Sequence, residues 1–171
     1  MKIITKLLSM FFISASLFFI ACEGGTEPET DPLLGSSNVV LSGDITNAYN
    51  ADCVAGMVQE DSTSGFVVYL KPQNSTSSEQ LSLVKLSQTL PPVGLYKIGE
   101  NVDSGEDFFG AYSIADTSIY FMHSGTVEIT ESGSSKISGK FNLEGYYFDW
   151  PIDSTRVLTV KGNFSTVPIS L

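Results

Sequence analysis

Three stretches in the last third of the chain, residues 125–130, 137–144 and 158–165, alternate strictly between polar and apolar residues. Successive side chains of a β-strand point to opposite faces, so this period of two predicts strands with one face on a core and the other in water. The expected core residues are Val127, Ile129, Phe141, Leu143, Leu158, Val160 and Phe164, and the expected exposed residues are Glu128, Lys140, Asn142 and Lys161.

The rest of the chain after residue 38 also consists of short apolar or alternating runs separated by polar turns, and it contains no convincing helix. Further strands are expected near residues 39–43, 53–58, 66–70, 81–86, 93–98, 108–114 and 119–122. About eight to ten antiparallel strands predict an all-β fold, either a β-sandwich or an up-and-down barrel. The pattern leaves both architectures open.

Two of the alternating strands share a glycine two residues before a phenylalanine. The steps are Gly139-Lys140-Phe141 and Gly162-Asn163-Phe164. A glycine inside a strand leaves a gap that an aromatic ring on the neighbouring strand can cover. If the two strands pair antiparallel, each phenylalanine can lie over the other strand's glycine and fix the register.

The chain begins with Lys2 and Lys6, continues with an apolar run over residues 7–20, and reaches Ala21-Cys22. The run is shorter than the roughly 20 residues that span a bilayer. Phe19-Ile20-Ala21-Cys22 resembles the lipobox of bacterial lipoproteins, although leucine is commoner at the position of Phe19. The resemblance implies cleavage before Cys22 and lipidation of Cys22. An ordinary secretory signal, with small residues at Ser14-Ala15-Ser16, is the alternative.

These features divide the chain into a lipoprotein signal peptide at 1–21, a flexible acidic tether at 22–37 and a β domain at 38–171. Loss of Lys2 and Lys6 with the signal peptide changes the formal charge from −10 to −12. Such a chain would repel nucleic acid, so no nucleic-acid partner is expected. We expect a lipid-anchored protein of the bacterial cell envelope, at the outer membrane.

Cys53 is left without an intramolecular partner once Cys22 carries a lipid. It lies in an apolar run that is typical of a strand, which favours a small buried side chain over a catalytic thiol. The only histidine of the chain, His123, is interpreted as a turn residue, because a zinc site would need further ligands.

Four acids, Glu100, Asp103, Glu106 and Asp107, fall in one loop. Oxygen-rich loops can bind calcium, but this spacing does not follow the EF-hand order, and a solvated loop is the stronger interpretation. No cofactor or metal is expected.

The densest aromatic group of the β domain is Tyr146, Tyr147 and Trp150, expected in the connection between the last two strands. Such rings could contact a protein or glycan partner, or they could turn inward and cover one end of the core. Solvent accessibility separates the two hypotheses.

Gly94-Leu95-Tyr96, Ser124-Gly125-Thr126-Val127-Glu128-Ile129, Ile137-Ser138-Gly139-Lys140-Phe141 and Gly162-Asn163-Phe164 together resemble a group of Bacteroidetes lipoprotein domains of unknown function. The short acidic stretch after Cys22 loosely resembles the signals that send such lipoproteins to the cell surface. The resemblance implies a β fold over residues 38–169 and brings no activity or catalytic residues with it.

The function that the sequence favours is a membrane-anchored, non-enzymatic domain that binds or scaffolds an extracytoplasmic partner. A lipocalin-like barrel carrying a small apolar ligand is the alternative, and a surface glycan hydrolase with two facing carboxylates is third.

Overall fold

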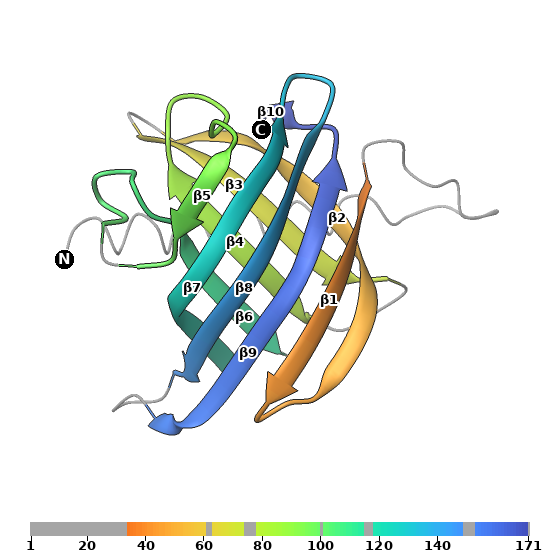
Figure 1. Cartoon of the computed structure of the whole chain (residues 1–171), viewed down its shortest axis with the longest axis vertical. Helices are drawn as coiled ribbons and strands as arrows, with labels where there is room; N and C mark the ends of the chain where they lie inside the picture. The colour runs from red at the N-terminus through yellow and green to blue at the C-terminus, as the bar shows by residue number, and fades with distance from the viewer. Residues whose placement is uncertain are drawn as a thin grey trace. The chain divides into compact units, whose positions relative to one another are not determined.

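The computed structural model describes residues 34–60, 63–73, 78–99, 101–114, 118–148 and 153–170. These residues form an all-β domain (Figure 1). Its strands are β1 (Gly35–Gly43), β2 (Asn47–Glu60), β3 (Thr63–Pro72), β4 (Gln80–Leu86), β5 (Gly94–Lys97), β6 (Phe109–Ile114), β7 (Ser118–Ser132), β8 (Ile137–Tyr147), β9 (Asp153–Thr166) and β10 (Ile169–Ser170).

The sheet closes on itself, which decides between the two architectures that the sequence left open. The strand order β1-β9-β8-β7-β6-β4-β3-β2 is completed by an antiparallel pairing of β2 with β1. Eight strands therefore form a closed antiparallel barrel, and the short strands β5 and β10 add to β7 and β2. Closure leaves none of the eight barrel strands with a free edge.

Strand β7 joins two stretches that the sequence predicted as separate strands, 119–122 and 125–130, so that expectation was wrong. No turn interrupts the chain between them. Instead the register with β8 shifts between Met122 and Ser124, and Gly125 adopts a positive φ of 121°. These irregularities allow one strand to bend, so that its first half pairs with β6 and its second half with β5.

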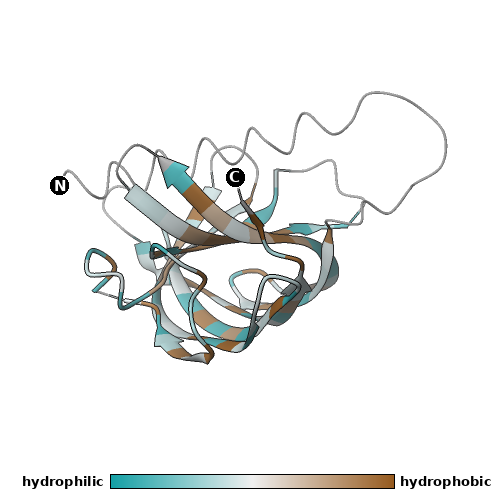
Figure 2. Ribbon diagram, turned by 90° about the horizontal axis from the view of Figure 1, so that it is seen from above, coloured by the Kyte–Doolittle hydropathy of each residue, from teal (hydrophilic) through white to brown (hydrophobic). Residues whose placement is uncertain are grey.

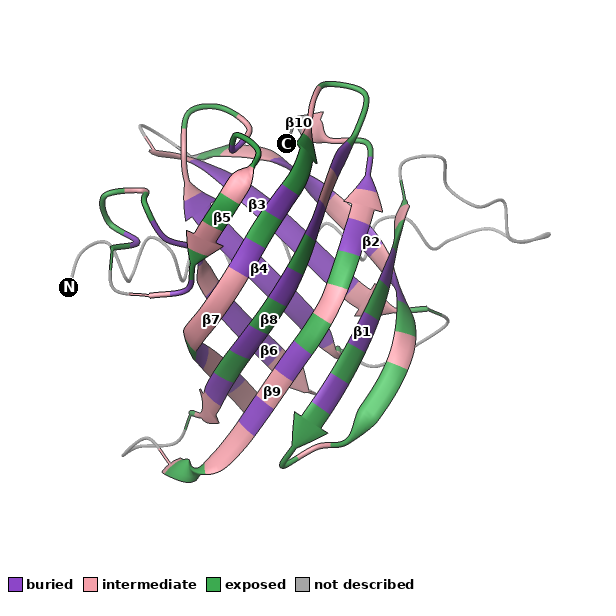
Figure 3. Cartoon of the chain, in the orientation of Figure 1, coloured by how far each residue is buried: buried purple, intermediate pink, exposed green. Residues whose placement is uncertain are grey.

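Side chains along β7, β8 and β9 alternate between buried and exposed positions, and the residues on each face are the ones that were predicted. Every residue expected in the core is buried, and Glu128, Lys140, Asn142 and Lys161 are exposed. Figure 3 shows this as alternating buried and exposed segments along β8. Figure 2 shows strands of the barrel whose colour changes between hydrophilic and hydrophobic along their length. The core residues point into the barrel and fill it.

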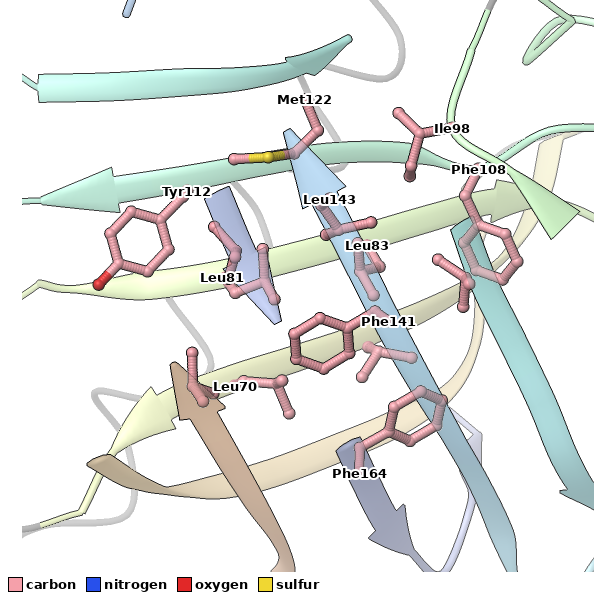
Figure 4. Close-up of a cluster of buried hydrophobic side chains, with 14 of the residues drawn as sticks. Leu70, Leu81, Leu83, Ile98, Phe108, Tyr112, Met122, Phe141, Leu143 and Phe164 are labelled. Atoms are coloured by element: carbon pink, nitrogen blue, oxygen red, sulfur yellow. The ribbon is translucent and has the colours of Figure 1, made fainter. Parts of the chain in front are cut away.

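The two glycine–phenylalanine steps pack as expected. Phe141 pairs with Gly162, and Phe164 pairs with Gly139. A Cβ atom on Gly162 would lie 2.6 Å from Cζ of Phe141, and one on Gly139 would lie 2.6 Å from Cε1 of Phe164. Each ring therefore occupies the space that the opposite glycine leaves empty. Both rings project into the barrel together with Leu70, Leu83 and Leu143 (Figure 4).

Strand β1 begins at Gly35, within the last residues that the sequence assigned to the tether. The remainder of the tether and the whole of the expected signal peptide lie outside the described residues.

Candidate functional sites

Tyrosine and charged side chains gather at the end of the barrel where β1 ends and β9 begins. This group, which we call the tyrosine end, consists of Tyr49, Tyr112, Tyr120, Tyr147, Asp44, Glu79 and Arg156. Cross-strand pairing brings it together, because Tyr112 lies opposite Tyr120, and Tyr120 lies opposite Tyr147. The tyrosine end thus draws on most strands of the barrel.

One half of the tyrosine end is organised around Asp44. The hydroxyl of Tyr120 donates a hydrogen bond to Asp44 Oδ2, and Arg156 Nη2 lies 2.8 Å from the same oxygen. These two partners hold the pKa of Asp44 below its ordinary value. The Arg156 guanidinium also lies 3.8 Å from the ring centroid of Tyr147. It therefore interacts with the Asp44 carboxylate and with an aromatic ring at the same time.

The other half is a chain of phenols. Tyr49 donates to the hydroxyl of Tyr112 over 3.3 Å, and Tyr112 donates to Glu79 Oε1. Burial raises the pKa of Tyr49 to about 12 and raises that of Tyr112 further. Burial together with the Asp44 carboxylate raises the pKa of Tyr120 to about 12. The phenols are therefore neutral hydrogen-bond donors at physiological pH, and no activated nucleophile results.

A second group of aromatic rings lies on the outside of the barrel, over β6, β7 and the end of β8. We call it the outer aromatic surface and define it as Phe109, Phe121, Phe148, Tyr146 and His123. The ring centroids of Phe109 and Phe121 are 5.7 Å apart, and those of Phe121 and Phe148 are 4.9 Å apart.

At the edge of this surface Tyr146 stacks on His123, with centroids 3.9 Å apart and planes at 17°. His123 Nε2 in turn lies 3.4 Å from Glu144 Oε1. The histidine is therefore an exposed partner of an aromatic ring and a carboxylate. It lies within β7 rather than in a turn, so that sequence interpretation was wrong.

The aromatic residues singled out from the sequence do not form one site. Tyr146 and Tyr147 belong to β8, not to the connection after it, so they point to opposite faces. Tyr147 turns inward, where its ring packs 5.4 Å from that of Tyr120, and Tyr146 faces outward. Trp150 lies outside the described residues. Tyr147 therefore covers part of one end of the core, whereas contact of Tyr146 with a partner stays a prediction.

Phe109 and Phe121 were missed by the sequence analysis. Phe109 directly follows the buried Phe108, and Phe121 sits between the inward-facing Tyr120 and Met122. An apolar run of this kind shows no alternation, so the outward-facing ring cannot be identified from periodicity alone.

The three described carboxylates of the acidic loop, Asp103, Glu106 and Asp107, differ in their surroundings. Asp107 is buried and its Oδ2 accepts a hydrogen bond from the backbone N–H of Asn101 over 3.0 Å, while Asp103 and Glu106 are exposed. Glu100 lies outside the described residues. Within the described ranges, no three His, Cys, Asp or Glu side chains form a group that could hold a metal ion.

Lys85 of β4 forms hydrogen bonds with the backbone of this acidic loop. Its Nζ donates to the backbone carbonyls of Gly105 and Glu106 and lies 5.0 Å from the ring centroid of Tyr96. Burial lowers the pKa of Lys85, partly offset by Asp107 and Glu106. The loop is therefore attached to β4 through the ammonium group of Lys85.

Cys53 is buried on the inner face of β2 opposite Leu70 and forms no disulfide. Burial raises the pKa of its thiol to about 12. The thiol is therefore protonated and enclosed by apolar side chains, and the prediction of a buried side chain is confirmed.

No helix among the described residues has the length and apolar character to cross a bilayer. Comparison with known proteins adds no assignment: no family model, no curated protein and no solved structure matches the chain.

Proposed function

We propose that this chain is a non-enzymatic lipoprotein of the bacterial cell envelope, tethered to the outer membrane through a lipid on Cys22, and that its barrel binds an extracytoplasmic partner. The lipobox-like ending at Cys22 and the acidic spacer support the tether. The resemblance to Bacteroidetes lipoprotein domains supports the same class of protein.

The outer aromatic surface is the observation that carries the binding role. Phe148 is 42% exposed, and Phe109, Phe121 and Tyr146 are only half-buried. The rings of Phe109, Phe121 and Phe148 contact one another in that order, and Tyr146 lies opposite Phe121 on the neighbouring strand, so the apolar area is contiguous. Contiguous exposed aromatic groups are typical of interaction sites, whereas isolated exposed apolar residues are ordinary.

A lipocalin-like carrier of a small apolar ligand is the second candidate. The closed eight-stranded barrel is compatible with it, and the tyrosine end supplies polar groups around one end of an apolar interior. Against it, the interior is filled by its own side chains, among them Phe141 and Phe164, which occupy even the gaps left by glycines. A ligand would have to displace these rings.

A glycan hydrolase receives less support. Such an enzyme needs two carboxyl groups that face each other across a cleft. At the tyrosine end, Asp44 accepts hydrogen bonds from Tyr120 and Arg156, and Glu79 accepts one from Tyr112. Both carboxylates are thus engaged in holding the end of the barrel together.

Two measurements test the proposal. Cys22→Ser should abolish labelling by radioactive fatty acid and release the protein from the membrane fraction; membrane retention of this variant would contradict the tether.

For the binding role, a photo-crosslinking residue at Tyr146 should yield adducts in intact cells. The same residue at Lys140, which is exposed on the same strand, should not. Equal crosslinking from both positions would contradict a specific surface.

A further inference from the structure

At the tyrosine end, two aromatic rings hold a cation next to a carboxylate. The ring centroids of Tyr120 and Tyr147 are 5.4 Å apart, with planes at 68°, so the rings lie edge to face. The Arg156 guanidinium lies 5.9 Å from the first centroid and 3.8 Å from the second. Its Nη2 is 2.8 Å from Oδ2 of Asp44. The negative ring faces attract the cation, and the carboxylate balances its charge.

The acidic loop repeats this arrangement with different residues. The rings of Tyr96 and Phe108 are edge to face, with centroids 5.5 Å apart and planes at 74°. Lys85 Nζ lies 5.0 Å from the first centroid and 6.0 Å from the second. Burial lowers the pKa of Lys85, and the nearby carboxylate of Asp107 opposes that shift. An edge-to-face pair of rings beside a carboxylate therefore holds a cation at two separate places in this fold.

The outer aromatic surface presents the same two components on the outside of the barrel. Phe121 and Phe148 are edge to face, with centroids 4.9 Å apart and planes at 77°. Tyr146 lies opposite Phe121, and Glu144 precedes Tyr146 by two residues on the same face of β8. Within the described ranges, the lysine and arginine side chains that lie over aromatic rings are Lys85 and Arg156, and neither lies over these rings.

The rings and the carboxylate of this surface are accessible to a partner. Phe148 is 42% exposed, and the side chain of Glu144 is 48% exposed. His123 holds the carboxylate beside Tyr146, because it stacks on that ring and its Nε2 lies 3.4 Å from Oε1 of Glu144. The second oxygen of this carboxylate accepts no hydrogen bond from the described residues, so an incoming donor can bind there.

Charge favours a basic partner for this surface. The chain has 19 acidic residues against 9 lysines and arginines, for a formal charge of −10. Such a charge speeds the encounter with a basic surface and slows the encounter with an acidic one. Arginine fits the surface better than lysine, because a planar guanidinium can stack on a ring while its N–H groups bind a carboxylate. Arg156 makes both interactions within this chain.

We propose that the outer aromatic surface binds an arginine side chain of a basic protein partner, with the guanidinium paired to Glu144 and packed against the exposed rings. This inference rests on the proposed binding role and names the chemistry of the partner.

The test uses the full-length lipidated protein in an uncharged detergent and measures the fluorescence anisotropy of three labelled peptides. The peptides carry arginine, lysine or citrulline at the same positions among glycines and serines. Citrulline has the shape of arginine without its charge. We expect the arginine peptide to bind at least about tenfold more tightly than the citrulline peptide, with the lysine peptide between them.

Two variants with matched controls locate the site. Glu144→Gln should weaken binding of the arginine peptide at least about fivefold. Glu128→Gln removes the same charge from an exposed position of β7 opposite Lys140, and it should weaken binding less than about twofold. Phe148→Ser should weaken binding about threefold. Leu95→Ser, which removes a side chain that is 70% exposed on β5, should leave binding unchanged.

Far-ultraviolet circular dichroism of each variant checks that the barrel is retained, and Glu144→Gln decides the result if Phe148→Ser does not fold. Equal affinity for the arginine and citrulline peptides would overturn the arginine proposal. So would an equal loss in Glu144→Gln and Glu128→Gln, or unchanged binding in a folded Phe148→Ser protein.

The binding role itself is scored separately by the photo-crosslinking residue at Tyr146. Crosslinking in cells without binding of the arginine peptide would overturn the arginine proposal and leave the binding role intact. Failure of both measurements would overturn both.

Discussion

Truncation of Phe141 to alanine is the sharpest test of how the barrel interior is held together. Phe141 is 4% exposed and its ring covers Gly162, so the variant loses the burial of the ring and opens a cavity beside a residue with no side chain. Phe→Ala substitutions in cores cost about 3–5 kcal/mol. Gly162 cannot fill the space, and the barrel wall closed by hydrogen bonds on both sides resists collapse. We therefore expect about 4 kcal/mol.

The assay is urea-induced unfolding followed by circular dichroism, with the free energy of unfolding obtained by linear extrapolation. For a domain of this size 1 kcal/mol corresponds to roughly 2–4 °C, so the melting temperature should fall by about 8–16 °C. Asn142→Ala, on the adjacent exposed position of β8, is the control and should stay within about 0.5 kcal/mol of the native protein. A loss below about 1.5 kcal/mol for Phe141→Ala, or an equal loss for Asn142→Ala, would refute the reasoning.

Three further predictions concern charged and reactive groups. The pKa of Asp44 is lowered by Tyr120 and Arg156, so its interactions stabilise the fold above its ordinary pKa of about 4 and are lost as the pH falls through the lower folded value. The melting temperature should therefore fall more steeply from about pH 5 to about pH 2 in the native protein than in Asp44→Asn, and equal slopes would contradict this. Cys53, with a pKa of about 12, should resist iodoacetamide in a folded Cys22→Ser background at about pH 8 and react after denaturation; rapid reaction in the folded protein would show that the thiol is accessible. Lys85→Met should accelerate amide hydrogen exchange in the loop of residues 101–107, because two carbonyls lose their donor, whereas the exposed Lys97→Met should not; unchanged exchange in Lys85→Met would show that the loop holds itself.

The sequence could identify a candidate site only where a short stretch of neighbouring residues defines that site. The lipobox-like ending identifies Cys22 as a candidate lipidation site without any structure, and that remains a prediction. The aromatic group was placed in a connecting loop, but Tyr146 and Tyr147 lie in β8, where their neighbouring positions separate them to opposite faces. Phe109 and Phe121, which complete the outer aromatic surface, come from β6 and from β7, and their contact depends on how those strands pair.

The sequence by itself determined the all-β class and the inward and outward faces of the last strands, and it indicated that Phe141 would cover Gly162 if their two strands paired antiparallel. These follow from nearest-neighbour properties of a strand: side chains alternate with a period of two, and a glycine leaves a gap of fixed size. Only the tertiary structure decided that the sheet closes into a barrel, that two predicted strands merge into β7, and that Asp44, Tyr120 and Arg156 meet at one end. Closure rests on the pairing of β1 with β2 and with β9 at the far end of the chain. Strands pair through backbone N–H and C=O groups, which almost every residue type carries. The sequence pattern of a strand therefore does not show which other strand it pairs with.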